Sequence, residues 1–388
     1  MRVRRKIATG MAVLLGFCAA TNAQQIGKYV PIAAGSDEDH AIRDINAATD
    51  PAQKLSLIDK FASGLGQGNM ELVTDELYVN YYLSQKNYAK TYEYGDKLFA
   101  IDPDNLLNAV SLVRAASEEG NTDKLLGYGE KSSALLQRFS ASAPPSGMSE
   151  DQWKQQKASA LQSSADNIHY IEYALYTGVL HTKDAAKRAG QLSKFAELFP
   201  ASTYANQALG VAASSYQEVQ NIPKMLEVAN GLLAKDPNNL GMMLLLADYY
   251  GEKGEQLDKA EAYAKKAASL ADSAPKPEGI ADDQWKQQTT LQKGLAFSAL
   301  GQVNLQKKDN ALAVTNLQAA APLVKADNFS YARNQFRLGY AFLNLKKLAE
   351  AKQAFTDAAS VNTPYKQPAL DKLKALPAKA PVTRKRAA

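Results

Sequence analysis

Cysteine is almost missing from this chain of 388 residues, since Cys18 is the only one. A disulfide framework needs paired cysteines, and Cys-ligated zinc and iron–sulfur sites need several, so these classes are excluded. A cysteine nucleophile is also excluded in any form of the protein from which Cys18 is removed. Apolar residues, in contrast, are plentiful, at 46% hydrophobic against 22% charged. That is enough for a large core, so a mainly disordered chain is excluded as well.

Histidine is equally scarce and stands in no metal motif. His40, His169 and His181 are the three histidines, and none belongs to a His-Glu-x-x-His pattern. The glycines at 64–68 lead into no Gly-Lys-Ser/Thr sequence and indicate a linker rather than a phosphate loop. Residues 102–105 lack the glycine and the closing glutamate of a calcium loop and are interpreted as a turn. We therefore expect no catalytic residue, no cofactor and no metal, with an enzyme site assembled across helices as an alternative.

Basic charge is concentrated at the two ends of the chain. The whole sequence carries 45 Lys and Arg against 40 Asp and Glu. Residues 1–23 and residues 377–388 hold four basic side chains each and no acidic one, so the body between them has 37 basic against 40 acidic side chains. A general nucleic-acid binder needs a basic face, so no nucleic-acid partner is expected. The basic, Pro-containing end predicts a disordered tail, with peripheral contact to membrane phosphates or an acidic partner as an alternative.

The first 23 residues are typical of an export signal. Residues 1–6 are basic, residues 7–20 are mainly apolar, and Thr21 to Ala23 supply the small residues of a cleavage site. The apolar stretch falls short of the roughly 20 residues of a spanning helix, and no later segment is long and apolar enough to span a membrane. We predict an exported protein, periplasmic or secreted, without a transmembrane segment in the mature chain. The alternatives are an uncleaved anchor and lipidation at Cys18, where Phe17 departs from the lipobox pattern.

Paired amphipathic helices repeat along the body. In the clearest unit, residues 330–364, small residues such as Gly339 and Ala351 lie at helical spacing beside large ones such as Phe355. The small residues let two helices approach closely, and the aromatic ring fills the space beside them. This order and spacing resemble the tetratricopeptide repeat, a helix–turn–helix unit of about 34 residues. The resemblance covers residues 70–364 and implies an all-α, right-handed superhelical solenoid of antiparallel helix pairs.

A longer period overlies the repeats. The sequence Asp-Gln-Trp-Lys-Gln-Gln at 151–156 recurs at 283–288, and Asp-Pro-Asp-Asn-Leu at 102–106 matches Asp-Pro-Asn-Asn-Leu at 236–240. We interpret this as an internal duplication, in which Asp151 and Asp283 cap helices and each Trp packs its loop back onto the helix. The predicted parts are a signal peptide (1–23), an N-terminal segment with short helices (24–69), a first repeat block (70–200), a second repeat block (201–364), a C-terminal capping helix (365–376) and the tail (377–388).

Binding is the function that these patterns favour. Tetratricopeptide arrays line a concave face with the first helix of each pair, so the resemblance implies a groove there. The residues that helical spacing projects onto that face mix aromatics, amides and single charges, which suits an extended peptide or a helix. They are Glu76, Asn80, Leu83, Tyr170, Tyr173, Asp248, Gln302, Arg333, Phe336, Tyr340 and Asn344.

Three of these candidates, Arg333, Phe336 and Tyr340, share one helix face. We expect an exposed arginine beside an aromatic pair, with packing of the two rings against neighbouring helices as the alternative. The predicted function is an exported scaffold that binds a protein or peptide partner through the concave groove. The alternative is an accessory or substrate-binding module for a cell-envelope enzyme or a polysaccharide system.

Overall fold

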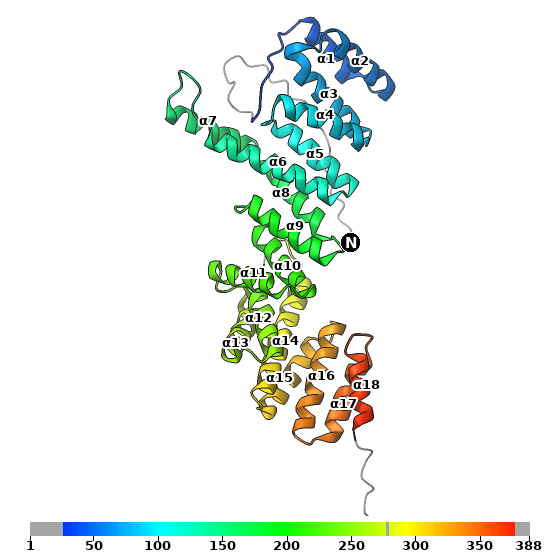
Figure 1. Ribbon diagram of the computed structural model, residues 1–388, viewed down its shortest axis with the longest axis vertical. Helices are drawn as coiled ribbons and strands as arrows, with labels where there is room; N and C mark the ends of the chain where they lie inside the picture. The colour runs from blue at the N-terminus through cyan, green and yellow to red at the C-terminus, as the bar shows by residue number, and fades with distance from the viewer. Residues whose placement is uncertain (1–25, 277–278, 377–388) are drawn as a thin grey trace, which may run out of the picture. The chain divides into compact units, whose positions relative to one another are not determined.

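The computed structural model describes residues 26–276 and 279–376. Over these residues the chain forms eighteen α-helices and one short 3₁₀ helix, with no strand (Figure 1). The predicted all-α class is therefore confirmed, and the right-handed twist stays a prediction. The predicted signal at 1–23 and the predicted tail at 377–388 lie outside the described residues. No helix in either described range combines the length and the apolar character needed to cross a membrane.

The described residues divide into two compact units, and unit 1 comprises residues 26–183 and 194–205. Helices α1 to α6 each pack on the next, α6 packs on α8, and the first helices α3 and α5, then α5 and α8, also contact each other. First helices therefore meet first helices, as in a stack of helix pairs. The elements are α1 (Asp37–Ala47), α2 (Pro51–Gly64), η1 (Gly68–Met70), α3 (Glu71–Ser84), α4 (Tyr88–Ile101), α5 (Leu106–Glu119), α6 (Thr122–Ala141), α7 (Glu150–Ser163), α8 (Ala165–Leu180) and the second part of α9 (Ala185–Leu198).

Unit 2 comprises residues 184–193, 206–276 and 279–376 and repeats the same packing. Each helix from α11 to α17 packs on the next, and α12, α14 and α16 contact one another across the intervening helices. After the first part of α9, its helices are α10 (Ala205–Glu218), α11 (Ile222–Lys235), α12 (Leu240–Lys253), α13 (Leu257–Ser273), α14 (Asp282–Gln306), α15 (Asn310–Leu323), α16 (Asn328–Asn344), α17 (Leu348–Ala359) and α18 (Lys366–Ala375).

Four of the turns within the helix pairs follow one local rule. A residue with positive φ ends the first helix, and the Asn or Asp that follows caps the second by accepting a hydrogen bond from the backbone N–H three residues on. At the α14–α15 turn, Lys308 has φ of 62° and Asp309 accepts from Leu312 N at 3.1 Å. The same combination starts α4, α6 and α11. Each pair is thus closed within a few residues, which makes its two helices antiparallel.

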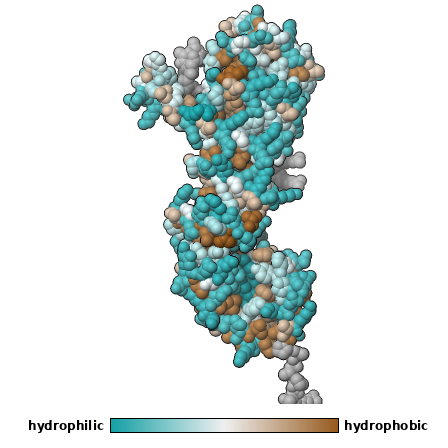
Figure 2. Space-filling view, viewed as in Figure 1, coloured by the Kyte–Doolittle hydropathy of each residue, from teal (hydrophilic) through white to brown (hydrophobic). Residues whose placement is uncertain are grey.

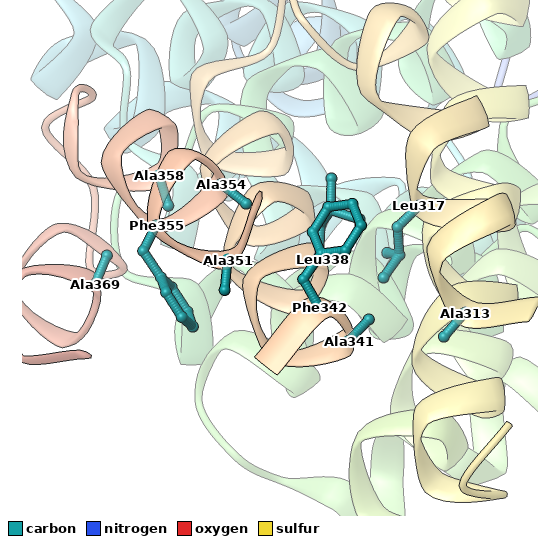
Figure 3. Close-up of a cluster of buried hydrophobic side chains, with 10 residues drawn as sticks. All are labelled: Ala313, Leu317, Leu338, Ala341, Phe342, Ala351, Ala354, Phe355, Ala358 and Ala369. Carbon is teal, nitrogen blue, oxygen red and sulfur yellow. The ribbon is translucent and has the colours of Figure 1, made fainter. Parts of the chain in front are cut away.

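Small residues bring the helices of a pair together, as predicted. Between α16 and α17, Ala351 and Ala358 are fully buried, and Figure 3 shows them beside Phe355 in the cluster that Ala369 of α18 joins. A Cβ atom on Gly339 would come within 2.6 Å of the Phe355 ring. Any larger residue at 339 would therefore push α16 and α17 apart.

The loop before α7 is packed back onto the helix by Trp153, as predicted. Its indole Nε1 donates to the Ser142 carbonyl oxygen at 2.9 Å, and its ring meets the Phe139 ring edge-on. The predicted caps Asp151 and Asp283 are wrong, because both helices begin earlier. Ser149 caps α7 by accepting from Gln152 N, and α14 has no side-chain cap at Ala281. Both aspartates lie in the first turn, where the helix dipole favours a carboxylate.

Candidate functional site

A cleft of about 390 Å³ opens in unit 2 between α10, α12 and α16. Its wall combines charged, amide and aromatic side chains from these helices, the α10–α11 turn and the residue before α18. Such a mixture suits a ligand with both polar and apolar groups. The lining residues are Ser214, Gln217, Glu218, Gln220, Ile222, Asp248, Tyr249, Glu252, Lys253, Phe329, Arg333 and Tyr365.

Two arginines of α16 tie one side of the cleft to α12. Arg333 Nη1 donates to Asp248 Oδ2 at 2.7 Å, and Arg337 Nη2 donates to Asp248 Oδ1 at 2.8 Å. Arg337 also donates from Nε to Glu252 Oε1 at 3.1 Å. The two arginines and the two carboxylates are each four residues apart, so each pair lies on one face of its helix. The result is a network of two positive and two negative charges.

Arg337 continues this network into the interior of unit 2. Its side chain is only 4% exposed, and Nη1 also donates to the Ser298 carbonyl oxygen at 3.3 Å and to Ser298 Oγ at 3.2 Å. These bonds reach from α16 across to α14. Since removing one partner of a buried pair leaves an uncompensated charge, Arg337 acts chiefly as a structural residue.

The network keeps Asp248 and Arg337 charged. Burial by itself raises the pKa of Asp248, but Arg333 and Arg337 outweigh burial and hold that pKa below its ordinary value. Burial by itself lowers the pKa of Arg337, whereas Asp248 and Glu252 raise it overall. The carboxylate and the guanidinium therefore stay ionised at neutral pH. This side of the cleft presents fixed hydrogen-bonding groups rather than a proton donor and acceptor.

Aromatic residues complete the cleft beside Arg333. The Phe329 side chain is 45% exposed, its ring lies 5.6 Å from that of Tyr365, and the Arg333 guanidinium lies 5.5 Å from its centre. Burial raises the pKa of the Tyr365 hydroxyl, so Tyr365 stays neutral. Most of the molecular face in Figure 2 is hydrophilic, with hydrophobic residues in small separate areas. An exposed phenylalanine in a polar cleft is thus a notable apolar contact point.

The three predicted residues Arg333, Phe336 and Tyr340 on α16 have different surroundings in the structure. Arg333 is not freely exposed as expected: its side chain is 15% exposed and paired with Asp248. Phe336 and Tyr340 stand edge-on to the Phe355 ring, each with 5.7 Å between centroids, and Phe336 also contacts Tyr365. The two rings therefore pack against neighbouring residues of the chain, as the alternative prediction has it. The small residues of α16 and α17 allow the two helices to approach closely, which places Phe355 against both rings. Their role in binding stays a prediction.

Two further predicted residues of unit 2 also have partners within the chain. Gln302 is buried, and its Nε2 donates to the Gly251 carbonyl oxygen at 3.5 Å. Asn344 is exposed and donates from Nδ2 to Asn310 Oδ1 at 2.9 Å. Of the six predicted residues in unit 2, only Asp248 and Arg333 line the cleft.

The predicted residues of unit 1 lie on α3 and α8. Glu76 Oε1 accepts from Asn105 Nδ2 at 3.0 Å, and burial raises the pKa of Glu76 although this bond opposes it. Asn80 is exposed and Leu83 is half-buried on the same helix. Tyr170 is half-buried, and burial raises its pKa. Tyr173 is 50% exposed and tilts against Tyr204 with 6.1 Å between centroids.

Sequence reasoning missed Glu252, Arg337, Phe329 and Tyr365. A signal for the first two existed, because Asp248 with Glu252 and Arg333 with Arg337 are like-charged pairs at a spacing of four. Like charges in that arrangement favour an oppositely charged pair on a facing helix. Helical spacing could also have found Phe329, which lies four residues before Arg333 on the same helix face, whereas Tyr365 comes from a loop, where helical projection says little. In the described part of the chain, no three His, Cys, Asp or Glu side chains are placed to hold a metal ion.

Comparisons with known proteins concern the fold. No protein-family model and no curated protein sequence matches the chain. Among solved structures, the Cut9–Hcn1 hetero-tetramer of the APC/C matches at 14% identity with a TM-score of 0.43. The match covers 87% of this chain and 63% of the chain in that structure. The TPR domain of P58(IPK) matches at 13% identity with a TM-score of 0.23, and the match covers 88% of this chain and 98% of that domain. Yeast Tom70 matches at 14% identity with a TM-score of 0.24, and the match covers 87% of this chain and 94% of the Tom70 chain.

These identities and TM-scores are too low to carry an argument about function, which rests on the residues of this chain. The helix pairs, their small-residue contacts and the contacts between successive first helices are properties of its own structure. In fold, the described residues form an all-α array of antiparallel helix pairs, which is the architecture that the resemblance to the tetratricopeptide repeat implies.

Proposed function

We propose that this protein is an exported scaffold that binds a segment of a partner protein in the cleft of unit 2. The observation that carries the proposal is the exposed Phe329 beside a fixed ion network. Aromatic residues and arginine are enriched where binding energy concentrates at protein interfaces, and Phe329 and Arg333 stand together here. Glu218, Gln217 and Lys253 add hydrogen-bonding groups around them.

The network supports this role by fixing the wall before any ligand arrives. Asp248 and Arg333 already hold each other, so a ligand does not need to order them, and the entropic cost of binding is reduced. A polar wall with one exposed ring suits an extended peptide that inserts an apolar side chain and leaves its backbone hydrogen-bonded. The cleft lies on first helices, which is where the resemblance places a concave groove.

Export is the part of the proposal that rests on the sequence alone. The basic, apolar and small-residue segments of 1–23 support it. Mass spectrometry of the protein isolated from its producing cells should find Gln24 as the first residue. A chain that retains residues 1–23 and stays in the cytoplasm would contradict export without affecting the cleft.

Replacing Phe329 tests the binding proposal. We expect Phe329→Ala to reduce capture of a specific partner from extracts of the producing cells about tenfold or more, because truncation of an interface anchor costs about 2 kcal/mol or more. Leu312→Ala is the matched control, since Leu312 is 43% exposed in the same unit and outside the cleft lining. Quantitative mass spectrometry of the captured proteins gives the ratio. Equal capture by both variants would place the binding surface elsewhere, and binding of a purified glycan in this cleft would favour the alternative of a polysaccharide-system module.

A further inference from the structure

Residues 26–28 lie against the α4–α5 turn of unit 1. Lys28 donates from its backbone N to Asp102 Oδ2 at 2.7 Å and from Nζ to the Ile101 carbonyl oxygen at 2.6 Å. Leu106 N donates in turn to the Ile26 carbonyl oxygen at 3.5 Å, and the Ile26 side chain is only 1% exposed. A bent, non-helical segment of the chain is thus held by both backbone and side-chain contacts to this turn.

Glycine is required in the middle of this segment. Gly27 has φ of +114°, and a Cβ atom there would lie 2.9 Å from Asp102 Oδ2 and 3.0 Å from Asn105 Cα. The backbone therefore approaches the turn more closely than any other residue allows. The turn selects the pattern aliphatic–Gly–Lys, with the aliphatic side chain buried and the lysine on a carbonyl at the end of α4.

The same turn recurs at the start of α12 in unit 2. Asp102 has φ and ψ of −135° and 88°, and Asp236 has −129° and 93°. In each turn the Oδ1 of that aspartate accepts from the backbone N two residues on, at 3.2 Å for Asp102 and 2.9 Å for Asp236. Asn105 and Asn239 then cap the following helix by accepting from the N–H three residues on, at 2.9 and 3.1 Å. The duplication has preserved the turn in three dimensions.

A basic side chain closes both turns in the same way. Arg138 donates to the Pro103 carbonyl oxygen at 2.8 Å, and Lys266 donates to the Pro237 carbonyl oxygen at 2.7 Å. The groups that receive residues 26–28 in unit 1 therefore have counterparts in unit 2. They are Asp236 Oδ2, the Lys235 carbonyl oxygen and Leu240 N.

The two turns differ in what covers them. Asp102 and Leu106 are each 2% exposed beneath the N-terminal segment, whereas Asp236 is exposed and Leu240 is half-buried. No group within 26–276 or 279–376 donates a hydrogen bond to Asp236 Oδ2. The chain's own segment is held by unit 1, so it leaves the second turn open.

We propose that the turn Asp236–Leu240 is a docking site for a segment of a partner protein that has the pattern aliphatic–Gly–Lys and bends at the glycine as residues 26–28 do. The segment's lysine backbone N–H would donate to Asp236 Oδ2, its glycine would lie over Asn239, and its lysine ammonium would bond the Lys235 carbonyl oxygen. This surface includes none of the residues that line the cleft, so its test is independent of the proposed function.

A synthetic peptide with the sequence of residues 24–34, labelled at its C-terminus, is the probe. Its binding to residues 24–388 is measured by fluorescence anisotropy. We expect Asp236→Asn to weaken binding about tenfold or more, because the amide presents a donor in place of the charged acceptor Oδ2 while keeping an oxygen for Asn238 N. The matched variant Asp102→Asn should leave the affinity within about twofold, since it alters only the occupied turn.

A second binding experiment changes the peptide instead of the protein. The same peptide with Gly27→Ala should bind the unaltered protein about tenfold or more weakly, because its Cβ meets the turn. Three results would each overturn the proposal: no binding of the peptide, binding that Asp102→Asn rather than Asp236→Asn abolishes, or equal affinity for the two peptides. Concentration-dependent dimers of the full chain that Asp236→Asn dissolves would support the site and identify a second copy as the partner.

Discussion

At the scale of single residues, burial decides which charges the fold tolerates. Asp75 on α3 is 7% exposed, and burial raises its pKa to about 6, with Lys97 opposing the shift and Glu71 adding to it. Asp248 is half-buried, but it has two arginines as partners, and its pKa is lowered. The two pKa shifts differ in sign because Asp248 has oppositely charged side chains as direct partners and Asp75 does not. A buried carboxyl without such a partner destabilises the folded state when it ionises.

This makes the stability of the protein depend on Asp75 and pH. Because the folded pKa lies above the unfolded value of 3.8, the folded state binds the proton more tightly, and the free energy of unfolding falls as pH rises from about 4 to about 6. We expect Asp75→Asn, which cannot ionise, to be about 1–3 kcal/mol more stable than the wild type at pH 7.5. At pH 4 the two should be nearly equal.

Urea denaturation at both pH values checks this expectation. A variant that gains the same stability at pH 4 and pH 7.5 would show that the gain does not come from the proton. A variant less stable at both would show that the carboxylate of Asp75 has a favourable partner in solution.

At the scale of elements, the contact between α16 and α17 depends on small residues. Ala351 is fully buried and belongs to the cluster with Phe342 and Phe355. We expect Ala351→Trp to destabilise the protein by about 3 kcal/mol or more, because overpacking of a dense contact forces the helices apart. Ala349→Trp is the control, since Ala349 is exposed on the same helix and changes by the same volume.

Thermal denaturation followed by circular dichroism compares the two variants. The control should melt within a few degrees of the wild type, and Ala351→Trp well below it. Equal melting temperatures would mean that α17 presents a different face to α16 in solution.

At the scale of the whole molecule, the sequence predicts the helix pairs but little of what joins distant helices. Periodicity and small residues such as Gly339 determine a local contact between neighbours, so the all-α class and the packing of α16 on α17 followed from the sequence. The bond between Arg333 and Asp248 joins residues 85 apart along the chain, and no local pattern specifies which first helices face each other.

The same limit explains the other differences. Residues 26–28 were predicted only as part of a segment with short helices, yet they bind the turn at Asp102, which is 74 residues away from Lys28. Phe329 is a different case, because it lies four residues before Arg333 on the same face of α16, and helical spacing could have found it. The position of residues 26–28 depends on tertiary contacts, which override local patterns.

The most direct test of the scaffold proposal is site-specific photo-crosslinking at the cleft. A photoreactive phenylalanine analogue replaces Phe329 in one variant and Leu348 in another, since Leu348 is 43% exposed in the same unit and does not line the cleft. After irradiation in the producing cells, position 329 should give a discrete adduct with one protein, identified by mass spectrometry, and position 348 should not. No adduct at 329, or the same adducts at both positions, would contradict a partner site in this cleft.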